Sequence, residues 1–278
     1  MQLGEALKKA ISRLEAGGVG SPRMNAEVLL MFVLRCDRAR LYAHPERELT
    51  PDESARYDEA LAERSRGVPS QYITGHQEFW GLDFIVSPAV LIPRPETEHL
   101  IETVLDLARG MHAPEIVDVG TGSGCIALAL AHELPTARIH ATDLSDGALE
   151  IAKANAARLQ LDTRMMFQKA DLLSEFASNS FDFVVSNPPY VGESEEDQVQ
   201  LEVRKFEPRN AVFAGPTGLE VIERLLPQAH TTLKDGGRLV MEISGTIQSG
   251  VKELLSVWQS YEIKSDLQGI PRVTIAVK

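Results

Sequence analysis

The chain has 278 residues, of which 44% are hydrophobic and 24% are charged, the ordinary balance of a folded globular protein rather than a disordered one. No apolar stretch approaches the roughly 20 residues that a membrane-spanning helix needs, so we expect no association with a membrane. The formal net charge of −12 opposes contact with a phosphate backbone and disfavours nucleic acid as a direct substrate.

The cysteine and histidine patterns argue against a metal or a disulfide framework. Cys36 and Cys125 are too few and too distant in sequence for either, and the histidines show no ligand spacing. We therefore expect no structural metal. The first residues include Glu5 and lack an apolar core before a small-residue cleavage site, so they do not resemble a secretory signal. A cytoplasmic location is the expectation.

Residues 1–72 predict a small helical domain. Apolar residues recur at helical spacing up to Leu14, and a second helix is predicted over 25–34. Thr50 is placed to cap a third helix, with Pro51 in its first turn and Glu53 completing a capping box. This region contains no catalytic constellation. Its charged residues are either a solvated surface or a docking surface.

Residues 73–92 predict a β-hairpin that links two domains, because aromatic and β-branched residues alternate around Gly81. A proline-rich segment, 92–98, follows and leads into a helix predicted over 96–109. Two interpretations of this segment stay open. It is either a linker whose acidic residues complement the helix dipole, or a turn that holds Arg94 against a ligand.

A glycine-rich turn follows the buried strand predicted over 116–119, and a helix follows the turn. This order of elements is typical of a nucleotide-type cradle, in which missing Cβ atoms let the backbone approach a ligand. The dinucleotide fingerprint would need glycine where Cys125 stands, which argues against a nicotinamide cofactor. The turn consists of Gly120, Thr121, Gly122, Ser123 and Gly124.

Acidic residues end the next two predicted strands. Asp143 lies about twenty residues beyond the glycines, where a carboxylate would accept the hydroxyls of a ribose; its alternative role is to cap a helix. Asp171 and Leu172 follow the strand predicted over 165–169, where they would border an adenine or form a surface turn.

The run Asn187-Pro188-Pro189-Tyr190 ends a fourth strand predicted over 181–185. The Asn187 side-chain carbonyl and the Pro188 backbone carbonyl are two acceptors that would hold a planar NH₂ group, and Tyr190 could pack on its flat face. The alternative is a turn that merely ends the strand.

Strands and helices alternate from residue 115 onward, so we predict an α/β fold with a doubly wound sheet over 93–278. The later elements are expected to be helices at 217–233 and 247–258 and strands at 238–243 and 272–277. The acidic stretch 192–200 is either a mobile lid or a solvated loop.

The assembled motifs resemble the peptide chain release factor glutamine methyltransferases (the PrmC/HemK family), which are Class I S-adenosylmethionine-dependent methyltransferases. The resemblance covers nearly the whole chain. It rests on segments 71–75, 78–82, 92–98, 118–124, 187–190, 206–208 and 266–269. The glycine turn is shared by many methyltransferases, whereas IPRPETE at 92–98 combined with NPPY at 187–190 is far more specific.

The resemblance implies a Rossmann-like methyltransferase fold with S-adenosyl-L-methionine as cofactor. Residues 120–124 would hold its methionine end, Asp143 its ribose, and Asp171 with Leu172 its adenine. Asn187 and Pro188, with Pro189 and Tyr190, would bind the substrate amide. That substrate would be the glutamine of the Gly-Gly-Gln motif in class 1 release factors, with the helical domain docking the factor.

The chain departs from the family pattern at Ala214 and Thr217, and around Ser244, where it is one residue longer. These departures affect the expected loop shape and not the expected reaction. Three alternatives remain: a ribosomal-protein glutamine methyltransferase, a DNA adenine amino-methyltransferase, and a non-catalytic cofactor-binding module. The net negative charge disfavours the DNA enzyme. The intact NPPY run disfavours the non-catalytic module, because an inactive site need not keep its paired acceptors.

Overall fold

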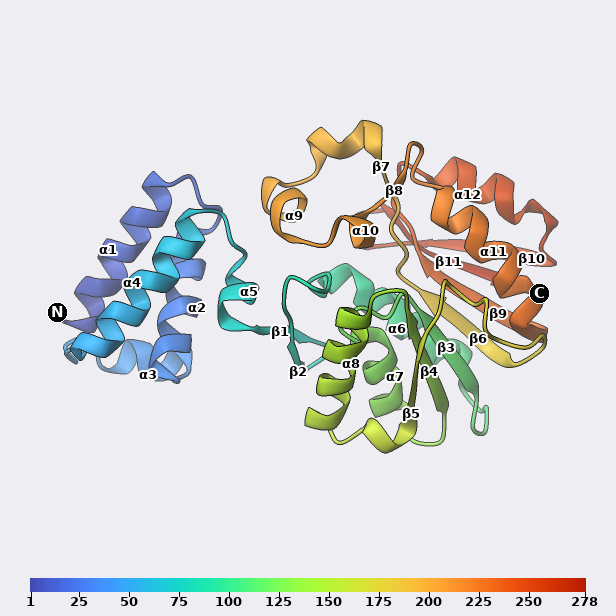
Figure 1. Cartoon of the computed structure of the whole chain (residues 1–278), viewed down its shortest axis with the longest axis horizontal. Helices are drawn as coiled ribbons and strands as arrows, with labels where there is room; N and C mark the ends of the chain where they lie inside the picture. Colours follow the sequence, from blue (N-terminus) through green and yellow to red (C-terminus); the bar gives the residue numbers. More distant parts are fainter. The chain divides into compact units, whose positions relative to one another are not determined.

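The structure, a computed structural model, describes residues 1–278. The chain divides into two compact units, whose elements are labelled in Figure 1. Unit 1 comprises Met1–His76 and Leu201–Phe206, and unit 2 comprises Gln77–Gln200 and Glu207–Lys278. None of the helices combines the length and the apolar composition that crossing a bilayer requires.

Unit 1 is a helical bundle around one apolar core, in which Leu14, Leu29 and Leu30 are fully buried. The predicted capping box is present: the Glu53 N–H donates to Thr50 Oγ1, and the Thr50 N–H donates to Glu53 Oε2. The helices are α1 (Leu3–Ala16), α2 (Pro22–Leu34), α3 (Arg38–Ala43), α4 (Pro51–Ser65), α5 (Ser70–Thr74) and α9 (Leu201–Phe206).

The late segment α9 joins unit 1 through a buried arginine of α4. Arg64 is only 4% exposed, and its Nη2 donates to Glu202 Oε1 at 2.8 Å while its Nε donates to Asn25 Oδ1 at 2.8 Å. The Phe206 ring lies close to Gly67, where a Cβ would meet it at 3.4 Å. Residues far apart in sequence thus complete this bundle.

The predicted hairpin is present as β1 (His76–Phe79) and β2 (Leu82–Ile85). Its turn residues, Trp80 and Gly81, have φ values of 54° and 69°, the left-handed pair that a tight two-residue hairpin turn requires. Extended structure begins only at His76, because α5 forms just before it.

Unit 2 contains a seven-stranded sheet in the order β10-β11-β9-β6-β3-β4-β5, which confirms the predicted doubly wound α/β fold. Strands β9, β6, β3, β4 and β5 are parallel, and β11 runs antiparallel between β9 and β10. The strands are β3 (Glu115–Val119), β4 (Arg138–Asp143), β5 (Met165–Lys169), β6 (Phe181–Ser186), β9 (Leu233–Glu242), β10 (Ser260–Ser265) and β11 (Pro271–Val277).

Helices cover both faces of this sheet, as Figure 1 shows. Consecutive residues of β3 point to opposite faces: Ile116 packs in a cluster with α6 and α7, and Val117 packs in another with α11 and α12. The helices are α6 (Glu98–Leu107), α7 (Cys125–Glu133), α8 (Asp146–Arg158), α10 (Arg209–Val212), α11 (Glu220–Thr232) and α12 (Gln248–Leu254).

Shorter elements complete unit 2. Strands β7 (Val191–Gly192) and β8 (Phe213–Gly215), which follow β6 in the chain, pair with each other in a separate two-stranded sheet. The acidic stretch predicted as a lid or a loop therefore starts with a strand and continues as a 3₁₀ helix. The 3₁₀ helices are η1 (Pro95–Thr97), η2 (Asp162–Arg164), η3 (Glu193–Gln198) and η4 (Leu255–Val257).

Candidate active site

A cavity of about 320 Å³ lies at the carboxyl ends of the central parallel strands of unit 2. This is the edge at which open α/β sheets bind ligands. The structure brings most of the predicted site residues together here. Those that line the cavity are Gly120, Thr121, Gly122, Ser123, Asp143, Asp171, Leu172, Asn187 and Pro189.

The glycine turn is fixed to the end of β4 by three backbone N–H groups. Those of Gly120 and Thr121 both donate to the Thr142 carbonyl, at 2.9 and 2.8 Å. That of Gly122 donates to Asp143 Oδ2 at 2.9 Å. The turn and the acidic strand end therefore form one hydrogen-bonded unit.

The first two glycines of the turn face open space, and both line the cavity. Gly120 and Gly122 have φ values of +72° and +55°, and a Cβ built on either would meet no atom within 4 Å. Gly124, at φ +82°, instead lies against the protein, because its Cβ would meet Leu128 at 3.1 Å and Ala152 at 3.2 Å. Gly124 does not line the cavity. The first two glycines leave room for a ligand, and the third permits close packing.

Two buried polar atoms, one on Asp118 and one on Ser123, have no hydrogen-bond partner. Asp118 is fully buried; its Oδ2 accepts the Thr121 hydroxyl at 2.6 Å, but its Oδ1 has no hydrogen bond. Burial raises the pKa of this carboxyl to about 7. The Ser123 hydroxyl is also buried without a partner. Unpaired buried groups beside an open cradle fit a polar ligand such as the amino-acid end of S-adenosylmethionine.

Asp143 and Asp171 both reach the cavity wall but differ in their partners. Asp143 Oδ1 accepts the Ser145 N–H at 2.9 Å, so both carboxylate oxygens already accept backbone N–H groups. Asp171 forms an ion pair with Arg224, which also lines the cavity. Leu172 has a φ of 58°, and its carbonyl accepts the Thr142 hydroxyl at 3.3 Å.

The NPPY loop is attached to the glycine turn through Ser186. The Ser186 hydroxyl donates to the Val119 carbonyl at 2.8 Å, immediately before Gly120. Asn187 Nδ2 donates to the hydroxyl of Thr97 at 3.1 Å, which leaves Oδ1 as its acceptor. Asn187 and its neighbour Pro189 line the cavity.

Pro188 and Tyr190 are not part of the cavity lining. The Tyr190 ring packs against the apolar cluster on the α11 face, and its hydroxyl donates to Glu242 Oε1 at 3.1 Å. Burial raises the pKa of this hydroxyl. The structure therefore places the tyrosine behind the loop rather than on the open face of the cavity.

A buried carboxylate connects the 92–98 segment to the segment after α9. Glu207 forms an ion pair with Arg94, and its Oε2 accepts the Ile92 N–H at 3.1 Å. Arg94 and Thr97 both line the cavity. Arg94 can be singled out from the sequence, whereas Thr97, Glu242 and Arg224 cannot. The only sequence signal for Thr97 was its place inside the IPRPETE run.

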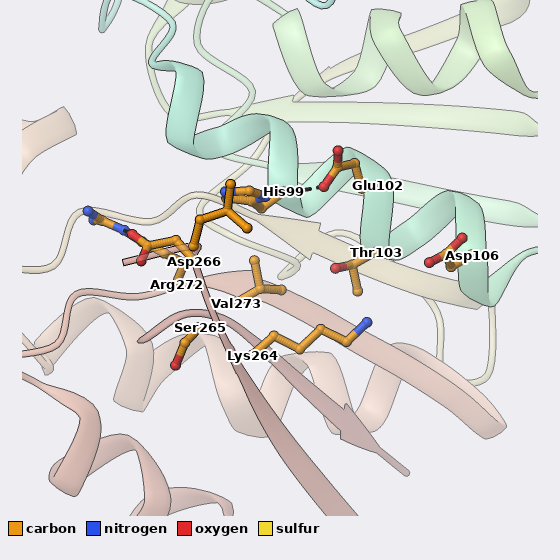
Figure 2. Close-up of a pocket in the computed structure, with 10 residues that line it drawn as sticks. His99, Glu102, Thr103, Asp106, Lys264, Ser265, Asp266, Arg272 and Val273 are labelled. Carbon is orange, nitrogen blue, oxygen red and sulfur yellow. Dashed lines mark hydrogen bonds and ion pairs between the residues drawn. The ribbon is translucent and has the colours of Figure 1, made fainter. Parts of the chain in front are cut away.

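A second hollow, of about 250 Å³, lies between α6 and the β10–β11 hairpin (Figure 2). It shares no lining residue with the cavity at the strand ends. Its walls carry a hydrogen bond between His99 and Glu102 and an ion pair between Asp266 and Arg272. Asp266 Oδ1 also accepts two N–H groups of its own turn, so this carboxylate serves the turn. No group of His, Cys, Asp and Glu side chains in the chain is arranged to hold a metal.

The chain is similar to known proteins over its whole length. Its sequence matches the profile of the PrmC N-terminal domain over residues 5–75 and that of the methyltransferase small domain over residues 96–205. It is 55% identical to a release factor glutamine methyltransferase of Koribacter versatilis, covering 100% of this chain and 99% of that protein. A protein of the same name from Moorella thermoacetica is 42% identical over the same shares.

Solved structures show the same fold at low sequence identity. The hMettl16 catalytic domain in complex with MAT2A 3′UTR hairpin 6 matches with a TM-score of 0.57 at 19% identity, covering 81% of both chains. A methyltransferase from Pyrococcus furiosus matches with a TM-score of 0.53 at 20% identity, covering 71% of this chain and 89% of that one. Because relatives of this name match the chain over its full length, the chain belongs to the release factor glutamine methyltransferase family, as its sequence motifs predict.

Proposed function

We propose that this protein methylates the side-chain amide nitrogen (N5) of the glutamine in the Gly-Gly-Gln motif of class 1 release factors, with S-adenosyl-L-methionine as donor. Two full-length relatives carry the name of this activity. The observation that carries the proposal is the position of Asn187, which lines the same cavity as the glycine turn. The residue proposed to bind the substrate amide and the turn proposed to hold the cofactor thus line the same cavity.

The residues proposed to hold the cofactor line the cavity, with the exception of Gly124. The backbone of 120–124 and the unpaired Ser123 hydroxyl would bind its methionine end. Asp143 would accept the ribose hydroxyls, and Asp171 with Leu172 would border the adenine. When bound, S-adenosylmethionine supplies a methyl group on a positively charged sulfur.

Asn187 and Pro188 are proposed to hold the substrate amide. Asn187 Oδ1 and the Pro188 carbonyl would accept its two N–H groups, fixing the nitrogen and drawing electron density toward it. That nitrogen forms the new N–C bond while the donor's C–S bond breaks, and it then loses one proton to water. No general base is needed before the transfer.

The helical region, residues 1–72, is proposed to dock the release factor, and residues 73–92 to link it to the catalytic domain at 93–278. The proposal makes translation termination in the cytoplasm the setting of the reaction. The net charge of −12 is compatible with a protein substrate and unfavourable for a DNA substrate.

The test is transfer of labelled methyl from S-adenosylmethionine to four acceptors: a class 1 release factor, the same factor with its Gly-Gly-Gln glutamine changed to alanine, a ribosomal-protein preparation, and duplex DNA. We expect label only on the unmodified release factor. Label on both factor versions, on ribosomal protein alone or on DNA alone would overturn the proposal and indicate the acceptor that replaces it.

A further inference from the structure

Thr97 lies directly behind the residue proposed to hold the substrate amide. Its side chain is buried, with 2% exposure, and its Oγ1 accepts a hydrogen bond from Asn187 Nδ2 at 3.1 Å. Thr97 is the last residue of the 3₁₀ helix η1, which runs directly into α6, and its own backbone is helical. Its hydroxyl therefore has no free helix end to cap.

Glu242, the last residue of β9, lies on the other side of Thr97. It is only 2% exposed, and its Oε1 accepts the Tyr190 hydroxyl at 3.1 Å. Its Oε2 is buried without a hydrogen-bond partner. Burial raises the pKa of Glu242, and the neighbouring Thr97 hydroxyl is foremost among the groups that lower it. Glu242 therefore lies beside the Thr97 side chain.

The order of donors and acceptors fixes the direction of each group. Thr97 Oγ1 accepts the hydrogen bond from Asn187 Nδ2, so the single proton of the Thr97 hydroxyl points away from Asn187 and is free for the neighbouring Glu242 carboxylate to accept. The oxygen of that hydroxyl then faces Asn187 as an acceptor and selects the NH₂ end of the Asn187 amide. The carbonyl end of Asn187 is left for the cavity.

We propose that Thr97 is a positioning residue for methyl transfer: with Glu242 behind it, it holds the Asn187 amide in the one orientation that presents a carbonyl oxygen to the substrate NH₂ group. This inference rests on the proposed function, because it assigns to Asn187 the substrate amide. Without the Thr97 hydroxyl, the Asn187 amide can rotate by half a turn and present its own NH₂ group, which repels the substrate donor.

The test compares three variants with the wild-type protein, using a class 1 release factor as acceptor. Thr97→Val keeps the side-chain shape but removes the hydroxyl, and we expect kcat to fall on the order of 10- to 100-fold. Thr97→Ser keeps the hydroxyl and should restore most of that loss. Thr274→Val is the matched control, because it removes a buried hydroxyl that has no partner, and its kcat should stay within about twofold of wild type.

A second readout does not depend on turnover. The side-chain NH₂ resonances of Asn187, identified by their loss in Asn187→Asp, should shift and exchange faster with water in Thr97→Val and stay unchanged in Thr274→Val. If Thr97→Val fails to fold, Glu242→Gln takes its place, because its amide NH₂ supplies a donor where the carboxylate only accepts, and the same loss of kcat is expected.

The inference is overturned if Thr97→Val keeps wild-type kcat and unchanged Asn187 resonances, or if Thr97→Ser is as impaired as Thr97→Val. If the wild-type protein fails to methylate the release factor, the proposed function is wrong. The claim that Asn187 presents its carbonyl oxygen to the substrate NH₂ group is then wrong as well. The resonances would then report only on the Thr97 contact. The two failures are therefore distinguishable.

Discussion

Asn187 combines two hydrogen-bonding ends that face different surroundings. Its NH₂ end bonds to the buried Thr97, and Asn187 itself lines the cavity, where its carbonyl end is the one left to bind a ligand. A side chain held by one end keeps the other end in place, so less conformational entropy is lost when a substrate binds. Removing this side chain should therefore affect the substrate step more than the cofactor step.

Replacement of Asn187 by alanine is expected to lower kcat on the order of 100- to 1000-fold, because one of two acceptors for the substrate amide is lost. The dissociation constant of S-adenosylmethionine should change by less than about threefold. Steady-state methyl transfer and calorimetric titration of the cofactor measure the two effects on the same preparation. An equal loss of both would contradict the role proposed for Asn187.

The site residues that the sequence predicts share one property: each stands at or just after the carboxyl end of a predicted strand. Asn187 and Asp143 were found in this way, because parallel strands bring their carboxyl ends to one edge. Thr97 precedes a helix and owes its role to Asn187 and Glu242, which are distant in sequence. No local pattern carries that information.

The elements around the glycine turn are held together by one asparagine of α8. Asn155 is fully buried; its Oδ1 accepts the Ile85 N–H at 2.7 Å, and its Nδ2 donates to the carbonyls of Ile85 and Ser123 at 3.0 and 2.9 Å. Through these bonds α8 connects the strand β2 to the turn that lines the cavity.

Asn155→Ala should lower the free energy of unfolding by about 2–4 kcal/mol, because it breaks three buried hydrogen bonds and leaves the partner groups unpaired. Urea unfolding followed by circular dichroism measures the loss. Lys153→Ala, on the exposed side of the same helix, is the control and should change stability by less than about 0.5 kcal/mol. A loss no larger than that of the control would contradict the role of Asn155.

Two glycines of the same turn should respond differently to alanine. At Gly122 the positive φ costs about 1–2 kcal/mol of stability, and the new methyl group enters the open cavity, so cofactor affinity should fall on the order of tenfold or more. At Gly124 the methyl group meets Leu128 and Ala152, so the stability loss should be the larger of the two. Thermal unfolding and calorimetric titration separate these effects. Wild-type affinity in Gly122→Ala would contradict the cradle assignment.

The sequence predicts the bounds of an element well where a repeat of apolar residues or a helix cap defines them. It predicts them poorly where pairing with a strand distant in sequence defines them. The helix predicted over 217–233 begins only at Glu220, because Gly218 has a φ of +85° and cannot continue a helix. Strand β10 was not predicted, since its residues are mostly exposed and its register is supplied by β11. The short pairing of β7 with β8 likewise depends on distant residues.

At the scale of the whole molecule, buried carboxyl groups make the stability of the protein depend on pH. The pKa of Asp118 is raised by burial from its ordinary value of 3.8 to about 7, and burial also raises the pKa of Glu242. A group whose pKa is raised on folding stabilises the protein fully below its unfolded pKa. That contribution is lost as the pH rises toward the folded pKa.

Asp118→Asn should remove this pH dependence. Between pH 5 and pH 7 the stability of the wild-type protein should fall relative to that of the variant, by at most about 1.4 kcal/mol per pH unit. In this range the unfolded chain has already lost the Asp118 proton, whereas the folded protein still holds it, so folding becomes less favourable as the pH rises. Urea unfolding at pH 5, 6 and 7 gives the difference. A difference that does not change with pH would contradict the assigned titration.

The contribution of α9 to the N-terminal bundle has a consequence for modular exchange. The chain passes between the two units three times, because Leu201–Phe206 returns to unit 1. A chimera in which only residues 1–76 come from a relative would set that relative's counterpart of the buried Arg64 against this chain's own Glu202. Such a chimera should melt at a lower temperature than one that carries both segments. The helical unit is thus a discontinuous module, and we expect it to keep its stability in a new protein only together with its second segment.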